Sequence, residues 1–415
     1  MRIAFIHQGY FFGGGGAELH CRREAEALAA RGHSVTIVTD APAKGAGQPL
    51  KAPSGCDMAF FEAGLRIQSC AKQLVKLSNV RGFYRTTEWM KRHTRVGMYA
   101  AKPAAPALSR LECLREQDVI CLMHSSSTPL LWNIQPVLAR RARRYVTVAL
   151  PLLHPREMAL APGVFKKLHA GFDVVNTSTE YESRYLTNNI GMTNKMVVTG
   201  VGSDEFREPV AGGTFRRRHG VPPAAPLVLF LGRKIFNKGV THVIEAMNRV
   251  WGVYPGACLA LVGFSHNPSS WLKGCLSKTR YGLSDQVVNL DDVSIREREE
   301  ALAACDIMAA PSVSDSFGIV YLDAWRHRKP VIGCRNTCCE SFIEDGVNGW
   351  LVDFGNTEQI ADAILNVFGN RALAGAMGEQ GCQKWKRCYT WEIIAAGMEK
   401  LAQEALDERT LHDSF

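Results

Sequence analysis

Residues 2–40 read RIAFIHQGYFFGGGGAELHCRREAEALAARGHSVTIVTD. The apolar run RIAFIH predicts a buried strand, and a glycine-rich loop follows it. A helix is expected from about residue 17 to residue 30, because Gly32 then ends the helical pattern and SVTIVTD forms the next strand. A strand, loop, helix and strand in this order are typical of the start of a parallel α/β sheet.

The same pattern continues to about residue 200 and starts again after an interruption. Residues 41–58 are expected to form a loop and residues 66–95 a basic helix. Prolines and glycines over residues 207–226 indicate a linker between domains. Further strands are predicted for DVICLM, YVTVAL, DVVNTS and KMVVTG before the linker, and for PLVLFLG, ACLALVG, VVNLDDV, DIMAAPS and KPVIGC after it.

The two series predict an α/β protein with two tandem Rossmann-like domains, each a doubly wound parallel sheet, facing a cleft. We place the N-terminal domain at residues 1–206, the C-terminal domain at residues 207–388 and a terminal helix at residues 389–415. The terminal segment is expected to be helical because its apolar residues recur with nearly helical spacing. Ligands of such folds bind outside the carboxyl ends of the strands.

Composition indicates a globular, cytoplasmic protein. No run of 18 apolar residues is present, and the first residues lack the cationic start and cleavage site of a signal peptide. The 13 cysteines are odd in number and form no repeated C-x-x-C pair. They are therefore expected to be reduced thiols.

Positive charge is concentrated in the first half of the chain. Residues 1–205 contain 26 Lys and Arg against 16 Asp and Glu, whereas residues 206–415 contain 23 against 24. A solvated basic helix face explains this excess, and so does an anionic partner, either lipid headgroups at the inner face of the plasma membrane or a phosphate-bearing acceptor. Nucleic acid is disfavoured, because the chain has no zinc-finger spacing and no aromatic-basic RNA motif.

Two loops carry residue types suited to phosphate. Four glycines at residues 13–16 let the backbone approach a ligand at a helix N-terminus, although a flexible turn is the alternative. They do not fit G-x-G-x-x-G, which argues against a nicotinamide-dependent enzyme. The loop after PLVLFLG contains three cations, Arg233, Lys234 and Lys238, just before a predicted helix. Cations are normally unfavourable there, because the N-terminus of a helix carries partial positive charge. A diphosphate between these cations removes the conflict, and cations that only decorate the surface are the alternative.

Two aspartates flank a predicted helix start in SDSFGIVYLDAW, residues 314–325. Phe317 and Gly318 begin the helix, and the unpaired amides of its first turn are expected at the cleft. Asp315 precedes that turn, and Asp323 lies on nearly the same face two helical turns later. Carboxylates here accept hydrogen bonds from ligand hydroxyls, as an acid does with ribose in dinucleotide folds. A helix cap and a solvent-facing acid are the alternative.

In this order, the motifs resemble the retaining GT-B glycosyltransferases of glycosyltransferase family 4 (glycosyl transferases group 1), over almost the whole chain. GRKIFNKG matches the family pattern G-R-x-x-x-x-K-G, and residues 315–323 match E-x(7)-E. The segment VGSDEF is similar to the family's domain-joining segment, from which Gly202 and Ser203 depart. IEDGVNGWLV matches a following loop and strand, and TWEIIAAGMEKL resembles the terminal helix that crosses back to the first domain.

The resemblance implies a hexosyl- or glycosyltransferase of the EC 2.4 class. It would move a sugar from a UDP- or GDP-sugar to a glycan or lipid-linked acceptor with retained anomeric configuration, in cell-surface polysaccharide or glycolipid synthesis. No metal and no cofactor are implied, because the nucleotide sugar is the donor substrate.

Site residues follow from the same resemblance. Arg233 and Lys238 would neutralise the leaving diphosphate, Asp315 would lie near the donor sugar, and Asp323 would bind the ribose hydroxyls. His154 follows a predicted strand of the first domain and would contact sugar or acceptor, with an ordinary loop histidine as the alternative; His124 occupies a similar strand end. The implied catalytic residues are Arg233, Lys238, Asp315 and His154, and the donor-binding residues are Gly15, Gly16, Arg233, Lys238, Phe317, Gly318, Ile319 and Asp323.

The chain departs from the family at both acids. Asp315 and Asp323 stand where the family has glutamates, so each carboxylate reaches roughly 1.3 to 1.5 Å less far. The segment RNTCCESFIEDG also lacks the family's glycine pair and proline before its acid, Glu340. A second hypothesis is therefore a glycosyltransferase-like binding or scaffold protein with weak catalysis.

Overall fold

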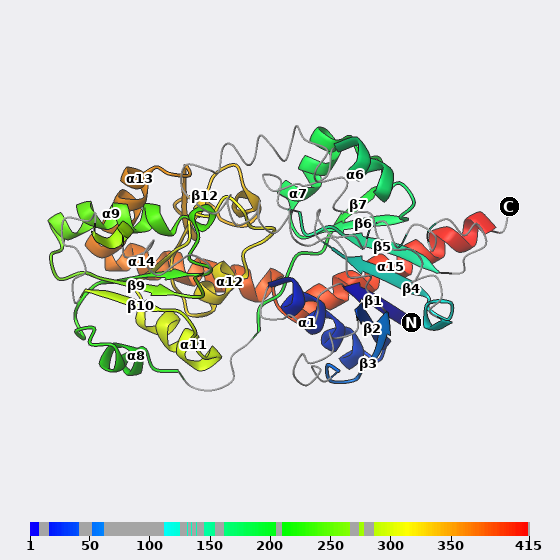
Figure 1. Cartoon of the computed structure of the whole chain (residues 1–415), viewed down its shortest axis with the longest axis horizontal. Helices are drawn as coiled ribbons and strands as arrows, with labels where there is room; N and C mark the ends of the chain where they lie inside the picture. Colours follow the sequence, from blue (N-terminus) through cyan, green and yellow to red (C-terminus); the bar gives the residue numbers. More distant parts are fainter. Residues whose placement is uncertain are drawn as a thin grey trace. The chain divides into compact units, whose positions relative to one another are not determined.

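The computed structural model describes residues 1–7, 16–40, 52–61, 112–124, 131, 134, 138, 145–153, 162–204, 210–265, 274–277 and 286–413. The chain folds into two compact units (Figure 1). The first unit contains the described residues up to Gly202 and those from Trp391 onward, and the second contains the described residues of Ser203–Thr390. The chain therefore passes between the units twice.

The first unit is built on a seven-stranded sheet of order β3-β2-β1-β4-β5-β6-β7, in which every pair of neighbours is parallel. Its strands are apolar and rich in β-branched residues, as expected for a parallel sheet covered on both faces. The strands are β1 Arg2–His7, β2 Ser34–Asp40, β3 Cys56–Phe61, β4 Val119–Met123, β5 Val146–Leu150, β6 Val174–Thr177 and β7 Lys195–Val198. The described helices of this unit are α1 Gly16–Ala30, η3 Glu112–Leu114, α6 Pro162–His169, α7 Glu180–Tyr185, the π-helical turn η5 Leu186–Ile190 and α15 Trp391–Asp413.

The terminal helix α15 belongs to the first unit, which confirms the prediction that it returns there (Figure 1). Five of its buried side chains recur with helical spacing and pack into one core with residues of β1 and α1. They are Ala395, Met398, Leu401, Ala402 and Ala405. Ile393 of the same helix is exposed.

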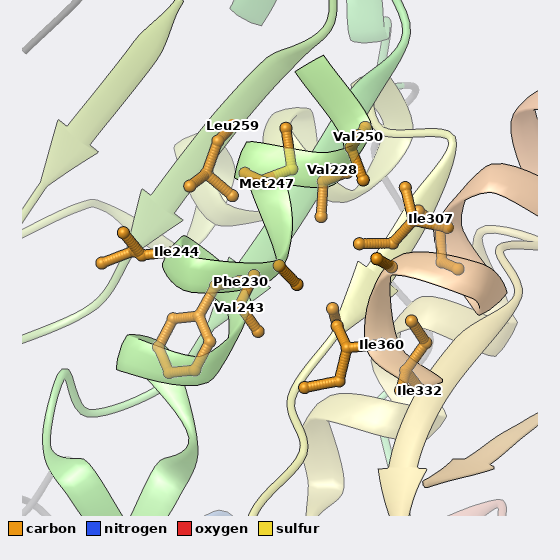
Figure 2. Close-up of a cluster of buried hydrophobic side chains, with 14 of the residues drawn as sticks. Val228, Phe230, Val243, Ile244, Met247, Val250, Leu259, Ile307, Ile332 and Ile360 are labelled. Carbon is orange, nitrogen blue, oxygen red and sulfur yellow. The ribbon is translucent and has the colours of Figure 1, made fainter. Parts of the chain in front are cut away.

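The second unit is built on a six-stranded parallel sheet of order β10-β9-β8-β11-β12-β13. The strands are β8 Leu227–Leu231, β9 Cys258–Val262, β10 Val287–Leu290, β11 Ile307–Ala309, β12 Val331–Cys334 and β13 Gly349–Val352. The described helices are α8 Gly212–Arg218, η6 Phe236–Lys238, α9 Val240–Val253, α11 Ile295–Ala304, α12 Ile319–Arg326, η7 Cys338–Ser341, α13 Thr357–Gly369 and α14 Arg371–Cys388. Figure 2 shows side chains of β8, α9 and β9 gathered in its core, among them Phe230, Met247 and Leu259.

The strands predicted from apolar runs are present, with one difference. The prediction of a loop over residues 41–58 is wrong at its end, because β3 begins at Cys56 and pairs with β2. The basic helix predicted at residues 66–95 lies outside the described residues. The twelve described cysteines are all free thiols.

Both chain passages are closely packed within their own units. In the first unit, a Cβ added at Gly202 would lie 2.5 Å from Cδ2 of Trp391, so only glycine fits against this ring. In the second unit, the Ser203 N–H donates to the carbonyl oxygen of Tyr389 at 3.0 Å. Residues 201–203 are therefore fixed by contacts that lie far away in the sequence.

Among the described residues, no helix combines the length and the apolar character needed to cross a membrane.

Candidate functional site

Two loops meet at the carboxyl ends of the neighbouring strands β8 and β11. The Val313 N–H donates to the carbonyl oxygen of Asn237 at 3.0 Å. Gly239 has a left-handed φ of 79°, and a Cβ there would lie 2.3 Å from the carbonyl oxygen of Pro311. Only glycine meets both conditions, so the GRKIFNKG loop docks directly on the loop that carries Asp315.

Lys238 and Asp315 form an ion pair across these loops. The Lys238 Nζ also donates to the carbonyl oxygen of Ser314 at 2.9 Å. Both side chains keep some contact with solvent, 12% and 20% exposed respectively. An ammonium has three hydrogens, and these contacts use two of them, so Lys238 can still donate to an entering anion.

The segment 317–319 lies beside Asp315. Gly318 is the N-cap of α12 with φ 94°, so Asp315 is not the N-cap residue of this helix. A Cβ on Gly318 would lie 2.6 Å from Cε2 of Tyr321 and 3.8 Å from Cγ of Asp315. The Tyr321 hydroxyl donates to the carbonyl oxygen of Ala310, which fixes that ring in place. The α12 N-terminus is therefore held next to the Asp315 carboxylate.

Phe317 and Ile319 contribute backbone rather than exposed side chains. The Phe317 ring is buried and stacks on Phe342 with ring centroids 4.8 Å apart. Ile319 is the first residue of α12 and is half-buried. The first amides of a helix have no partner within the helix and carry its positive end.

The three cations of the loop after β8 differ in their surroundings. Arg233 is exposed. Lys234 is fully buried, and its Nζ contacts Asn289 Oδ1 at 2.7 Å, the Leu290 carbonyl oxygen at 3.0 Å and Asp291 Oδ1 at 2.5 Å. Burial lowers the pKa of Lys234, against the effect of the Asp291 carboxylate. Lys234 therefore ties the β8 and β10 loops together, whereas Arg233 and Lys238 reach solvent.

Asp323 lies in α12 with only 3% of its surface exposed, so the alternative of a solvent-facing acid is wrong. The Ser203 Oγ donates to Oδ1 of Asp323 at 2.6 Å. Arg326 Nη2 donates to the same oxygen at 3.3 Å, and Arg298 Nη1 lies 3.8 Å from Oδ2. The carboxylate is thus held by a hydroxyl and two guanidinium groups.

A second buried acid, Glu299 of α11, supports these guanidinium groups. Its carboxylate accepts from Arg326 at 2.9 Å, from His327 Nε2 at 2.8 Å and from Arg298 at 3.1 Å. Burial alone would raise the pKa of Glu299, but the His327 hydrogen bond and the two arginine charges lower it to about 2. Glu299 therefore stays ionised and links α11 to α12. Neither Ser203 nor Glu299 was identified from the sequence.

Of the site residues predicted in the first domain, the structure describes only some. Gly16 is the first residue of α1 and is exposed, whereas Gly15 and His154 lie outside the described residues. His124 follows β4, is 2% exposed and lies with Nε2 3.1 Å from Nε2 of His169. Burial lowers the pKa of His169 to about 4. His124 and His169 are therefore both buried inside the first unit.

Within the described residues, no three His, Cys, Asp or Glu side chains are arranged to hold a metal ion.

Comparison with known proteins gives a family match for the second unit. Residues 225–370 match the family model of the glycosyl transferases group 1. A lipopolysaccharide core biosynthesis glycosyltransferase, LpsE of Rhizobium meliloti, is 31% identical over 181 residues. This alignment covers 43% of the chain and 50% of LpsE, so the matched part spans half the length of that relative.

Solved structures share the fold over almost the whole chain. The sucrose-phosphate synthase of Thermosynechococcus elongatus has a TM-score of 0.77 at 19% identity, covering 98% of this chain and 99% of that one. Anabaena HepE, solved with UDP and glucose, has a TM-score of 0.71 at 18% identity, covering 97% and 100%. The chain therefore has the GT-B fold, and its residues 225–370 match the model of the glycosyl transferases group 1.

Proposed function

We propose that this protein is a retaining, metal-independent glycosyltransferase of family 4. Its donor is a UDP- or GDP-sugar, and its acceptor is a glycan or lipid-linked molecule of cell-surface polysaccharide or glycolipid synthesis. Arg233, Lys238, Asp315 and Asp323 all lie inside the stretch that matches the group 1 family model. LpsE is named for lipopolysaccharide core biosynthesis. HepE, which has the same fold, was solved in complex with UDP and glucose.

The observation that carries this proposal is the pairing of Lys238 with Asp315 beside the α12 N-terminus. This site places opposite charges side by side. It consists of a cation, a carboxylate and the first amides of a helix. A nucleotide sugar also has two chemically different parts, an anionic diphosphate and a neutral sugar with hydroxyl groups. The cation and amides suit the diphosphate, and the carboxylate suits the sugar.

In the proposed mechanism, donor binding changes the partners of the ion pair. The Lys238 ammonium turns to a diphosphate oxygen, together with the Arg233 guanidinium and the amides of residues 318–319. The Asp315 carboxylate then accepts hydrogen bonds from the donor sugar, and Asp323 accepts from the ribose. Negative charge grows on the diphosphate as the bond to the sugar breaks, so these donors stabilise the transition state more than the bound donor.

The remaining parts of the proposal concern the first domain. Gly15, Gly16 and His154 complete the site on the acceptor side, and the basic charge of residues 1–205 attracts either an anionic membrane surface at the inner face of the plasma membrane or a phosphate-bearing acceptor.

Donor binding is tested by thermal unfolding with a panel of UDP- and GDP-sugars, with and without EDTA. A ligand at 100 times its Kd stabilises the folded state by about 2.7 kcal/mol, so at least one nucleotide sugar should raise the melting temperature. Lys238→Ala removes a charge-assisted hydrogen bond and should abolish the rise at the same concentration. Lys400→Ala is the matched control, because Lys400 is 79% exposed on α15.

No rise with any nucleotide sugar, or an equal rise in Lys238→Ala, would remove the basis of the proposed site. A rise that EDTA abolishes would contradict metal independence alone.

A further inference from the structure

Ser203 is where the chain enters the second unit, and its contacts connect that entry to the site. Its backbone N–H donates to the carbonyl oxygen of Tyr389, next to the residue where the chain leaves the unit. Its hydroxyl donates to Oδ1 of Asp323 at 2.6 Å, although 120 residues separate the two in sequence. Both residues are 3% exposed, so water does not compete for this hydrogen bond.

The chemistry of the hydrogen bond fixes the direction of the Asp323 carboxylate. Ser203 gives its one hydroxyl hydrogen to Oδ1, and Arg326 adds a longer bond to the same oxygen. On Oδ2 the described contact is Arg298, at 3.8 Å, which is longer than a hydrogen bond. Ser203 therefore occupies one carboxylate oxygen, while the other one accepts no hydrogen bond from the described residues.

We infer that Ser203 is a positioning residue for donor recognition, acting through Asp323 on the ribose hydroxyls of the nucleotide. This inference rests on the proposed function, in which Asp323 accepts from the ribose. An aspartate side chain is shorter than a glutamate and has one torsion fewer, so a hydrogen bond to one carboxylate oxygen leaves the group little freedom to turn. The hydroxyl of Ser203 supplies this constraint, and Ser203 lies where the chain enters the second unit.

The test compares ligands that differ only in the hydroxyls concerned. Calorimetry gives the Kd of UDP, GDP and their 2′,3′-dideoxy counterparts for the wild type, Ser203→Ala, Asp323→Asn and the double variant. Thr147→Val is the matched control, since the buried Thr147 hydroxyl also donates to an aspartate, Asp173, at 2.8 Å, but in the first unit. Thermal unfolding of each variant shows whether it is folded.

In Ser203→Ala the Kd of the preferred ribonucleotide should rise about tenfold, as expected for losing the orientation of a charged acceptor. The Kd of the dideoxy counterpart should not change, because that ligand has no hydroxyl for Asp323. Ser203→Ala should add nothing in the Asp323→Asn background. Thr147→Val should leave both constants as in the wild type.

An equal loss for both ligands in Ser203→Ala would overturn the inference and make Ser203 a purely structural residue, as would no loss at all. Wild-type protein that binds ribo- and dideoxynucleotides equally would overturn the role of Asp323, and with it this inference, but not the proposed function. Wild-type protein that binds neither nucleotide would overturn both. If Ser203→Ala does not fold, Ser203→Cys takes its place, since a thiol keeps the volume and donates only weakly.

Discussion

At the scale of single residues, the site depends on glycines as much as on charges. Gly239 and Gly318 both have left-handed backbone angles and both press against neighbouring atoms. Each is close in sequence to a charged residue of the site: Gly239 directly follows Lys238, and Gly318 comes three residues after Asp315. These glycines set how closely the two charged side chains approach one another.

Replacing Gly239 tests this directly. Gly239→Ala places a Cβ 2.3 Å from the Pro311 carbonyl oxygen, so the two loops must separate. We expect a loss of about 2 to 5 kcal/mol in the free energy of unfolding, from the left-handed backbone together with the steric overlap, and a loss of nucleotide-sugar binding. Urea unfolding and calorimetry measure the two effects.

Gly220→Ala is the control, because Gly220 has a similar φ of 68° with nothing within 4 Å of an added Cβ. It should cost only the left-handed backbone term, about 1 to 2 kcal/mol, and leave binding unchanged. Equal effects of the two substitutions on binding would contradict the role given to loop docking.

At the scale of elements, α11 and α12 are joined by a buried charge network. Glu299 of α11 contacts Arg326 at the end of α12 and His327 just after it, and Arg326 in turn contacts Asp323. Two acids balance the charge of two arginines in this network, so removing one carboxylate leaves buried positive charge uncompensated.

Glu299→Gln should therefore lower the free energy of unfolding at neutral pH by about 3 to 5 kcal/mol. The folded-state pKa of Glu299, about 2, is below its ordinary value of 4.5, so its contribution is present above pH 4.5 and is lost as the pH falls toward 2. The difference between wild type and variant should shrink over that range in urea unfolding. Glu379→Gln, which breaks the exposed pair with Arg328, should show little effect at any pH. A difference that does not depend on pH would contradict an ionised Glu299.

Apolar runs predicted most of the elements because a strand buried on both faces must be apolar along its length. RIAFIH, SVTIVTD and PLVLFLG form β1, β2 and β8 for this reason. The strand β3 was missed because its first residues follow a stretch rich in proline and glycine. The charge network was also missed, because arginine, glutamate and histidine on a helix look the same in sequence whether they face solvent or one another.

At the scale of the whole molecule, the chain consists of two α/β units with a terminal helix returned to the first. Repetition of the strand-helix pattern predicted this organisation. The sequence also placed Arg233, Lys238 and Asp315 on loops that follow strands, and the strand order brings the last two together. The Ser203–Asp323 hydrogen bond was not predictable, since it joins residues 120 positions apart without any local pattern.

Catalysis is the central claim, and product formation tests it most directly. The nucleotide sugar that stabilises the protein is incubated with wild type, Lys238→Ala and Lys400→Ala, and mass spectrometry follows the release of nucleoside diphosphate with transfer of the sugar to a glycan or lipid-linked acceptor or to water. The account predicts turnover by wild type and Lys400→Ala, and a rate at least about 100-fold lower for Lys238→Ala, because the leaving diphosphate loses a positioned cation. A wild-type protein that binds the nucleotide sugar and releases no nucleoside diphosphate would contradict the account and favour a binding protein with the GT-B fold.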